Sequence, residues 1–123
     1  MKPIWIVDDD HSIRFVLEKA LVREDLAVRS FTNARDVLTA LDDDAPQVLV
    51  SDIGMPLVDG YELLRRVRAL GPAQGGDLPA IALTAFARAE DRVRALKAGF
   101  RAHVAKPVEP AELVATIASA AGR

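Results

Sequence analysis

Five residues with side chains suited to phosphate or metal chemistry each follow a short apolar run in this 123-residue chain. They are two adjacent aspartates, a third aspartate, a threonine and a lysine: Asp8, Asp9, Asp52, Thr84 and Lys106. The preceding runs are short and rich in β-branched and aliphatic residues, which is typical of buried strands. The carboxyl ends of parallel strands meet at one edge of a sheet. We therefore expect these five side chains to converge.

Three carboxylates in one place would repel one another strongly. At an effective dielectric of ~20, two unit charges 4 Å apart repel by about 4 kcal/mol. A hard divalent cation would offset this repulsion, and carboxylates, backbone carbonyls and waters are the ligands that Mg²⁺ prefers. The carbonyl of Gly54, in the turn just after Asp52, is well situated for such a role. The sequence therefore predicts a Mg²⁺ site formed by Asp8, Asp9, Asp52 and Gly54.

A carboxylate beside Mg²⁺ and a lysine can also act as a nucleophile toward phosphorus, which forms an aspartyl phosphate. Asp52 is the best candidate, because it lies on the central predicted strand with cationic groups arriving from both sides. Lys106 and the Thr84 hydroxyl would hold other phosphoryl oxygens, and positioning would supply most of the catalysis.

The rest of the chain supplies the elements that must position these residues. Strands are expected over residues 4–7, 27–31, 48–51, 80–84 and 102–105. Amphipathic helices are expected from a Ser12 cap to about Arg23, after a Thr32 or Asn33 cap to about 41, over 63–70, over 85–98 and from Glu109-Pro110 onward. This alternation predicts one α/β domain over residues 1–123, with a doubly wound five-stranded parallel sheet and five helices.

Two segments of this pattern are weaker. The helix over 85–98 carries few apolar residues and many charges, so we expect it to be the least firmly packed; Gly99 suits the position that ends it. Residues 71–79 are rich in glycine and proline and suggest an exposed connection. Trp5 is expected in the core, and the Asp10-His11 pair in a solvated loop.

Composition argues against several classes of function. The chain has 16 basic and 18 acidic residues, a formal net charge of −2 and no cysteine. Such a balance gives no electrostatic reason to expect direct nucleic-acid or anionic membrane binding. The absence of cysteine excludes disulfides, thiolate metal sites and thiol nucleophiles. With no signal-peptide pattern and no apolar run of ~20 residues, a cytoplasmic location is expected.

The order and spacing of the motifs resemble the receiver domains of two-component response regulators over essentially the full chain. The matching segments are Val7-Asp8-Asp9, Ser51-Asp52-Ile53-Gly54-Met55-Pro56 with Asp59-Gly60, Leu83-Thr84-Ala85, and Lys106-Pro107. The part through Ile53 looks most like receivers of nitrogen-regulation activators. Residues 71–110 look more like receivers attached to hybrid histidine kinases.

The resemblance implies a flavodoxin-like sheet with strand order 2-1-3-4-5 and a role for each motif residue. Asp52 would be the phosphoacceptor, Asp9 a direct Mg²⁺ ligand, Asp8 a ligand through water and Gly54 a carbonyl ligand. Thr84 and Lys106 would contact the phosphoryl group, with a cis peptide after Lys106. The donor would be a phosphohistidine on a sensor histidine kinase or phosphotransfer protein, and the output an unidentified domain or protein.

The resemblance also implies a switch. Phosphorylation would draw Thr84 inward and move the residue at position 103 behind it, which changes the surface formed by the fourth helix, fifth strand and fifth helix, roughly residues 89–121. Here position 103 is His103, where tyrosine or phenylalanine is more usual. Gly54, where many relatives carry a side chain over the site, and the bulky Phe86 are two further departures.

Two rival functions follow from the same residues. An aspartate-nucleophile phosphatase of the haloacid-dehalogenase type would use Asp8 and Asp10 as its paired acids, but it lacks a late acidic pair and gives Asp52 no role. A phosphorylation-independent pseudo-receiver would keep the fold without the chemistry, and the full acid, threonine and lysine set argues against it. A flavodoxin is less favoured still, because an acidic first loop repels a phosphate.

Overall fold

The computed structural model describes residues 2–85 and 88–122. Its elements are, in chain order, β1 (Ile4–Val7), α1 (His11–Arg23), β2 (Val28–Phe31), α2 (Ala34–Ala40), β3 (Val48–Asp52), α3 (Gly60–Arg68), the 3-10 helix η1 (Pro72–Gln74), β4 (Ala80–Thr84), α4 (Ala89–Ala98), β5 (Ala102–Ala105) and α5 (Pro110–Ala120). The five strands form one parallel sheet in the order β2-β1-β3-β4-β5, which confirms the expected fold.

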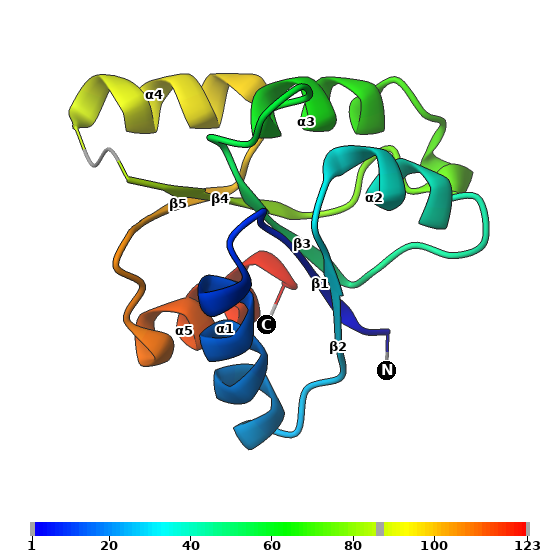
Figure 1. The fold of residues 1–123 in the computed structure, drawn as a ribbon. Coiled ribbons are helices and arrows are strands. Elements are labelled where there is room, and N and C mark those ends of the chain that lie inside the picture. The colour runs from blue at the N-terminus through cyan, green and yellow to red at the C-terminus, as the bar shows by residue number, and fades with distance from the viewer. Residues whose placement is uncertain (1, 86–87, 123) are drawn as a thin grey trace.

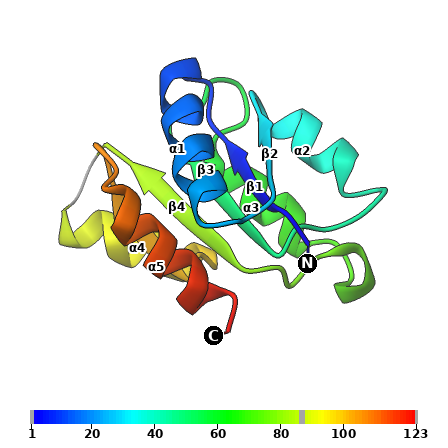
Figure 2. The ribbon, with the colours of Figure 1, turned by 90° about the horizontal axis from the view of Figure 1, so that it is seen from below.

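The sheet is the middle layer of three. Helices α2, α3 and α4 lie on one face, above the sheet in Figure 1, and α1 and α5 lie on the other, nearest the viewer in Figure 2. Because both faces are covered, every residue of the three central strands β1, β3 and β4 is buried. Trp5, predicted to be a core residue, is only 2% exposed.

Alternate residues of each strand enter different halves of the core. Ile4 and Ile6 pack in the cluster beneath α1 and α5, which also contains Leu17 and Leu113. Trp5 and Val7, which alternate with them along β1, pack in the other cluster, under α2, α3 and α4. Each fully buried large aliphatic side chain contributes roughly 1.5–3 kcal/mol, so the two clusters hold the sheet between its helix layers.

Helix α4 is held least firmly, as expected from its weak apolar pattern. Only Ala95 of this helix is buried, while Val93 and Leu96 are 48% and 44% exposed. Gly99 ends the helix at φ 111°, a left-handed conformation that favours glycine. The helix begins at Ala89 rather than at residue 85, because Arg88 is extended; residues 86–87 lie outside the described part of the chain.

Two local expectations about the start of α1 were wrong. The N-cap of α1 is Asp10, not Ser12: the Asp10 side chain accepts a hydrogen bond from the Ile13 amide. His11 is therefore the first residue of the helix rather than part of a loop.

The connection over 71–79 is exposed over residues 71–74 and at residue 77, but it also contains η1 and a buried part. Gly76 is buried with no room for a side chain, because a Cβ there would lie 1.9 Å from the Leu70 carbonyl oxygen.

No helix within residues 2–85 and 88–122 has the length and apolar character needed to cross a membrane.

Candidate functional site

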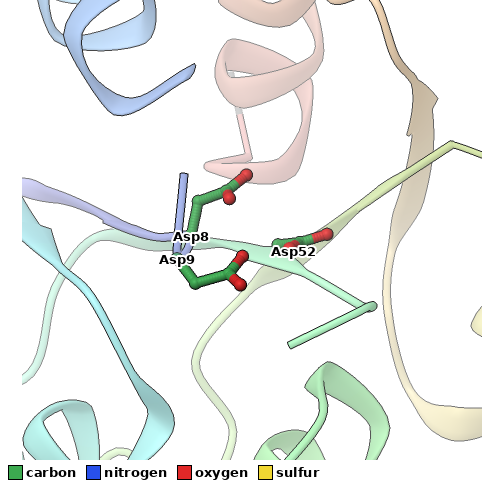
Figure 3. Close-up of side chains that lie close together, drawn as sticks. All are labelled: Asp8, Asp9 and Asp52. Carbon is green, nitrogen blue, oxygen red and sulfur yellow. The ribbon is translucent and has the colours of Figure 1, made fainter. Parts of the chain in front are cut away.

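The strand ends bring the predicted acids together at one edge of the sheet. Asp8 and Asp9 follow β1, and Asp52 is the last residue of the adjacent β3, as Figure 3 shows. One carboxylate oxygen from each of the three lies within 4.8 Å of the others. Their burial differs: Asp8 is fully buried, Asp52 is 5% exposed, and Asp9 faces solvent. The site therefore combines two desolvated carboxylates with one accessible carboxylate.

Lys106 joins the two buried acids. It follows β5, and its Nζ lies 3.1 Å from Asp8 Oδ2 and 3.1 Å from Asp52 Oδ1. The lysine side chain is 19% exposed. Thus the sheet delivers a cation from its far edge to the two strands that carry the acids.

The pKa values of Asp8 and Lys106 are both raised, for different reasons. Burial raises the pKa of the Asp8 carboxyl above its usual value, and this outweighs the hydrogen bond from the Asp10 amide and the nearby Lys106 ammonium. Burial alone would lower the pKa of the Lys106 ammonium, but its contacts with Asp52 and Asp8 raise it overall. The charged form of Asp8 is therefore disfavoured here, although Lys106 is charged beside it.

The loop from β1 to α1 is closed by hydrogen bonds around the acids. The Asp10 amide donates to Asp8 Oδ1 at 2.9 Å, and the Asp10 carboxylate caps α1. This cap argues against the phosphatase alternative, in which Asp10 would have to serve as a catalytic acid. Within residues 2–85 and 88–122, the exposed Asp9 side chain makes no hydrogen bond or ion pair. Its oxygens can therefore accept a new ligand.

The loop after β3 holds Asp52 from the other side. The Gly54 amide donates to Asp52 Oδ1 at 3.2 Å, and Gly54 itself is exposed. The Gly60 amide donates to the Ile53 carbonyl at 3.0 Å. A Cβ on Gly60 would lie 2.5 Å from the Asp52 carbonyl oxygen, so only glycine lets α3 start this close to β3.

The donor set fits a hard divalent cation. Asp8 Oδ2 is buried and, within the described part of the chain, accepts no hydrogen bond of regular geometry, although Lys106 Nζ is close to it. Clustered carboxylate oxygens of this kind are the ligands of Mg²⁺ and Ca²⁺, not of soft metals. The cluster of Asp8, Asp9 and Asp52 can therefore hold a metal ion.

The two predicted switch residues lie on neighbouring strands. Thr84 is the last residue of β4 and is 5% exposed. His103 is half-buried on β5, opposite Ala82, and its Nε2 is buried without a hydrogen-bond partner in the described residues. Because Val104 packs in the α1–α5 cluster, His103 points to the opposite face, toward α4. Phe86 lies outside the described residues.

The peptide bond between Lys106 and Pro107 is cis, as the family resemblance implied. Two further residues contact the backbone of this site. Gly60 stood in the matching Asp59-Gly60 segment without a stated role, and Arg14 had no signal in the sequence. Arg14 lies on α1 and donates from Nη1 to the Asp8 carbonyl at 2.7 Å. The residue pattern does not indicate this contact, because it depends on how a helix meets the end of a strand.

Comparison with known proteins gives a consistent result. The family model for the response regulator receiver domain matches residues 4–118. An uncharacterized 14.6 kDa protein of Leptolyngbya boryana is 48% identical over 111 residues, which cover 90% of this chain and 83% of that protein.

The DNA-binding transcriptional regulator NtrC of Proteus hauseri is 42% identical over 114 residues, or 93% of this chain, but the match spans only 23% of that regulator. A crystal structure of a CheY-like response regulator receiver domain protein from Methanospirillum hungatei has a TM-score of 0.85 and 30% identity, and the match covers 98% of this chain and 94% of that one.

Proposed function

Because the chain belongs to the response regulator receiver domain family, we propose that it accepts a phosphoryl group on Asp52 in a Mg²⁺-dependent reaction. The observation that carries this proposal is the contact of Lys106 Nζ, at 3.1 Å, with both Asp52 and the buried Asp8, beside the exposed Asp9. A nucleophilic carboxylate, a lysine and metal ligands are the groups that phosphoryl transfer to an aspartate requires.

The donor in this proposal is a phosphohistidine on a sensor histidine kinase or a phosphotransfer protein. A carboxylate oxygen of Asp52 forms a bond to phosphorus as the bond from phosphorus to the histidine nitrogen breaks, and the imidazole leaves with that electron pair. Asp8, Asp9, Asp52 and the Gly54 carbonyl would hold Mg²⁺, which when bound neutralises the charge on the transferring oxygens.

The remaining roles belong to the chain's own groups. Lys106 would exchange part of its contact with Asp52 for a phosphoryl oxygen, since an ammonium offers three donors. Thr84, at the end of β4, would donate its hydroxyl to another oxygen. In this proposal the protein is a signalling switch, and its only catalysis is its own phosphorylation and dephosphorylation.

The readout we propose is a change in the surface formed by α4, β5 and α5, with Thr84 and His103 as the linking residues. A phosphoryl group adds about −1.5 to −2 charge and three acceptor oxygens, enough to bias a two-state element. The weak packing of α4, with Val93 and Leu96 exposed, supports this choice. The output would be another domain or protein, with no direct binding of nucleic acid or membrane by this chain, and the proposed location is cytoplasmic.

The experiment is intact-mass analysis after incubation with Mg²⁺ and acetyl phosphate. We expect one added phosphoryl group on the wild type and on Asp42→Asn, which changes an exposed aspartate outside the acidic cluster, and none on Asp52→Asn. Equal labelling of Asp52→Asn and wild type would contradict the proposal. No labelling of the wild type with any Mg²⁺ concentration would also contradict it and would favour a pseudo-receiver.

A further inference from the structure

Arg14 makes a contact with the acidic site that none of the roles above uses. It lies in the first turns of α1, and its Nη1 donates to the backbone carbonyl of Asp8 at 2.7 Å. Arg14 is half-buried, and within residues 2–85 and 88–122 its guanidinium forms no ion pair. The contact is therefore made to the backbone that carries the metal ligands and not to their carboxylates.

This hydrogen bond completes a ring of contacts around the loop from Asp8 to Asp10. At its start, the Asp8 amide donates to the Phe31 carbonyl at 3.2 Å. Inside it, the Asp10 amide donates to Asp8 Oδ1, and at its end the Arg14 amide donates to the Asp10 carbonyl at 3.2 Å. The Arg14 side chain then spans from the helix back to the start of the loop, so both ends are fixed to each other.

The geometry of this loop matters because it sets where Asp9 is held. Asp9 is between the two fixed ends, and its exposed side chain makes none of the contacts that orient Asp8 and Asp10. Mg²⁺ demands near-ideal octahedral geometry, so small displacements of a ligand reduce its affinity. Groups that orient the ligands of a metal typically change affinity by about 10–100-fold when they are removed.

We propose that Arg14 is a positioning residue for the divalent cation: through its hydrogen bond to the Asp8 carbonyl it holds the loop that presents Asp8 and Asp9. This inference rests on the proposed function, because it concerns the same metal site. It is an effect of geometry and not of charge. A guanidinium near a cation repels it, so loss of the charge alone would tighten Mg²⁺ binding, whereas loss of the positioning contact weakens it.

The chain contains a matched control for this contact. Arg101 donates from the same atom, Nη1, to the Ala120 carbonyl, also at 2.7 Å, at the end of α5. Arg101→Ala therefore removes the same kind of hydrogen bond and the same charge without touching the acidic loop. Any general loss of stability should affect both variants alike.

The test is calorimetric titration of the unphosphorylated protein with MgCl₂. We expect Arg14→Ala to raise the Kd for Mg²⁺ about tenfold, toward the lower end of the ~10–100-fold range for such groups, and Arg101→Ala to leave it within twofold of the wild type. Arg14→Lys keeps a donor and should recover most of the affinity. With acetyl phosphate, the Arg14→Ala defect should shrink as Mg²⁺ reaches saturation.

Unchanged or tighter Mg²⁺ binding by Arg14→Ala would overturn the inference, as would equal weakening by Arg14→Ala and Arg101→Ala. If Arg14→Ala fails to fold, the Kd for Mg²⁺ is measured on Arg14→Gln instead. The shorter glutamine side chain does not reach the Asp8 carbonyl, so the same increase in Kd is expected. Failure of the proposed function looks different: the wild type itself would gain no phosphoryl group. If the wild type still bound Mg²⁺, the Kd values of the variants would decide the inference; if it bound none, the inference would be overturned as well.

Discussion

Lys106 Nζ lies 3.1 Å from Asp52 Oδ1, although 54 positions separate the two residues in the sequence. The contact forms because β5 and β3 are both parallel members of the sheet and end at the same edge. The same ammonium lies 3.1 Å from the fully buried Asp8. One lysine thus contacts both desolvated carboxylates of the site.

Removal of this lysine should destabilise the protein. Lys106→Met leaves Asp8 and Asp52 without their cation, and breaking a buried pair this way costs roughly 3–5 kcal/mol, so about 2 kcal/mol is expected for this partly exposed lysine. Thermal unfolding without Mg²⁺ measures the loss. Lys2→Met is the control, because Lys2 and Asp44 form an exposed pair at 3.5 Å, and such pairs contribute only about 0–1 kcal/mol. Equal stability losses in the two variants would contradict the account.

Asp8→Asn should raise the thermal stability at neutral pH in the absence of Mg²⁺. Burial raises the pKa of Asp8 above its ordinary 3.8, so at neutral pH its charged form opposes folding, and the neutral amide removes that opposition. The gain should disappear as the pH falls below 3.8, where Asp8 is protonated in both states. Added Mg²⁺ should stabilise the wild type more than the variant. A variant less stable than wild type at pH 7 would refute this explanation.

Gly60→Ala should impair phosphorylation as well as stability. Its Cβ would lie 2.5 Å from the Asp52 carbonyl oxygen and 2.8 Å from Ile53 Cα, so the backbone of Asp52 must move. We expect both Gly60→Ala and Gly76→Ala to lose about 1–3 kcal/mol from overpacking. Only Gly60→Ala should also slow labelling by acetyl phosphate, by at least about tenfold, since misplacement by 1 Å can reduce rates ~100-fold.

Gly71→Ala is the neutral control for that comparison, because a Cβ added at Gly71 would have no heavy atom within 4 Å among the described residues. The prediction is contradicted if Gly60→Ala and Gly76→Ala lose similar stability and are labelled by acetyl phosphate at similarly reduced rates. Proximity of the substituted residue to Asp52 would then have no special effect.

Glu62→Gln should make the free energy of unfolding depend less on pH under acidic conditions. Hydrogen bonds from Arg65 and Arg66 lower the pKa of Glu62 to about 2 from its ordinary 4.5. A lowered pKa contributes stability that is present above pH 4.5 and is lost as the pH falls through about 2. The wild type should therefore lose more stability than Glu62→Gln over this interval, as measured by urea unfolding at several pH values. Parallel curves for the two proteins would contradict this prediction.

The sheet and the meeting of Asp8, Asp9, Asp52 and Lys106 at its edge could be predicted from sequence because each depends on a local, repeated signal. Buried parallel strands are apolar throughout, and a polar residue directly after such a run must lie at the carboxyl edge of the sheet. The weak packing of α4 followed in the same way from its few apolar residues.

Features that depend on how elements meet could not be predicted. Asp10 and Ser12 are both good caps, and the structure has Asp10 at the N-cap of α1. Gly76 lies in a segment whose composition suggests an exposed loop, yet it is buried against Leu70. The hydrogen bond from Arg14 to the Asp8 carbonyl likewise joins a helix to a strand end.

The most direct test of the central claim is to identify the residue that carries the phosphoryl group. Borohydride reduces an acyl phosphate of aspartate to homoserine, so peptide mass analysis after acetyl phosphate, Mg²⁺ and borohydride reports the position. We expect homoserine at position 52 and none when Mg²⁺ is chelated. Homoserine at position 8 would contradict it and would instead support the phosphatase, in which Asp8 is the nucleophile.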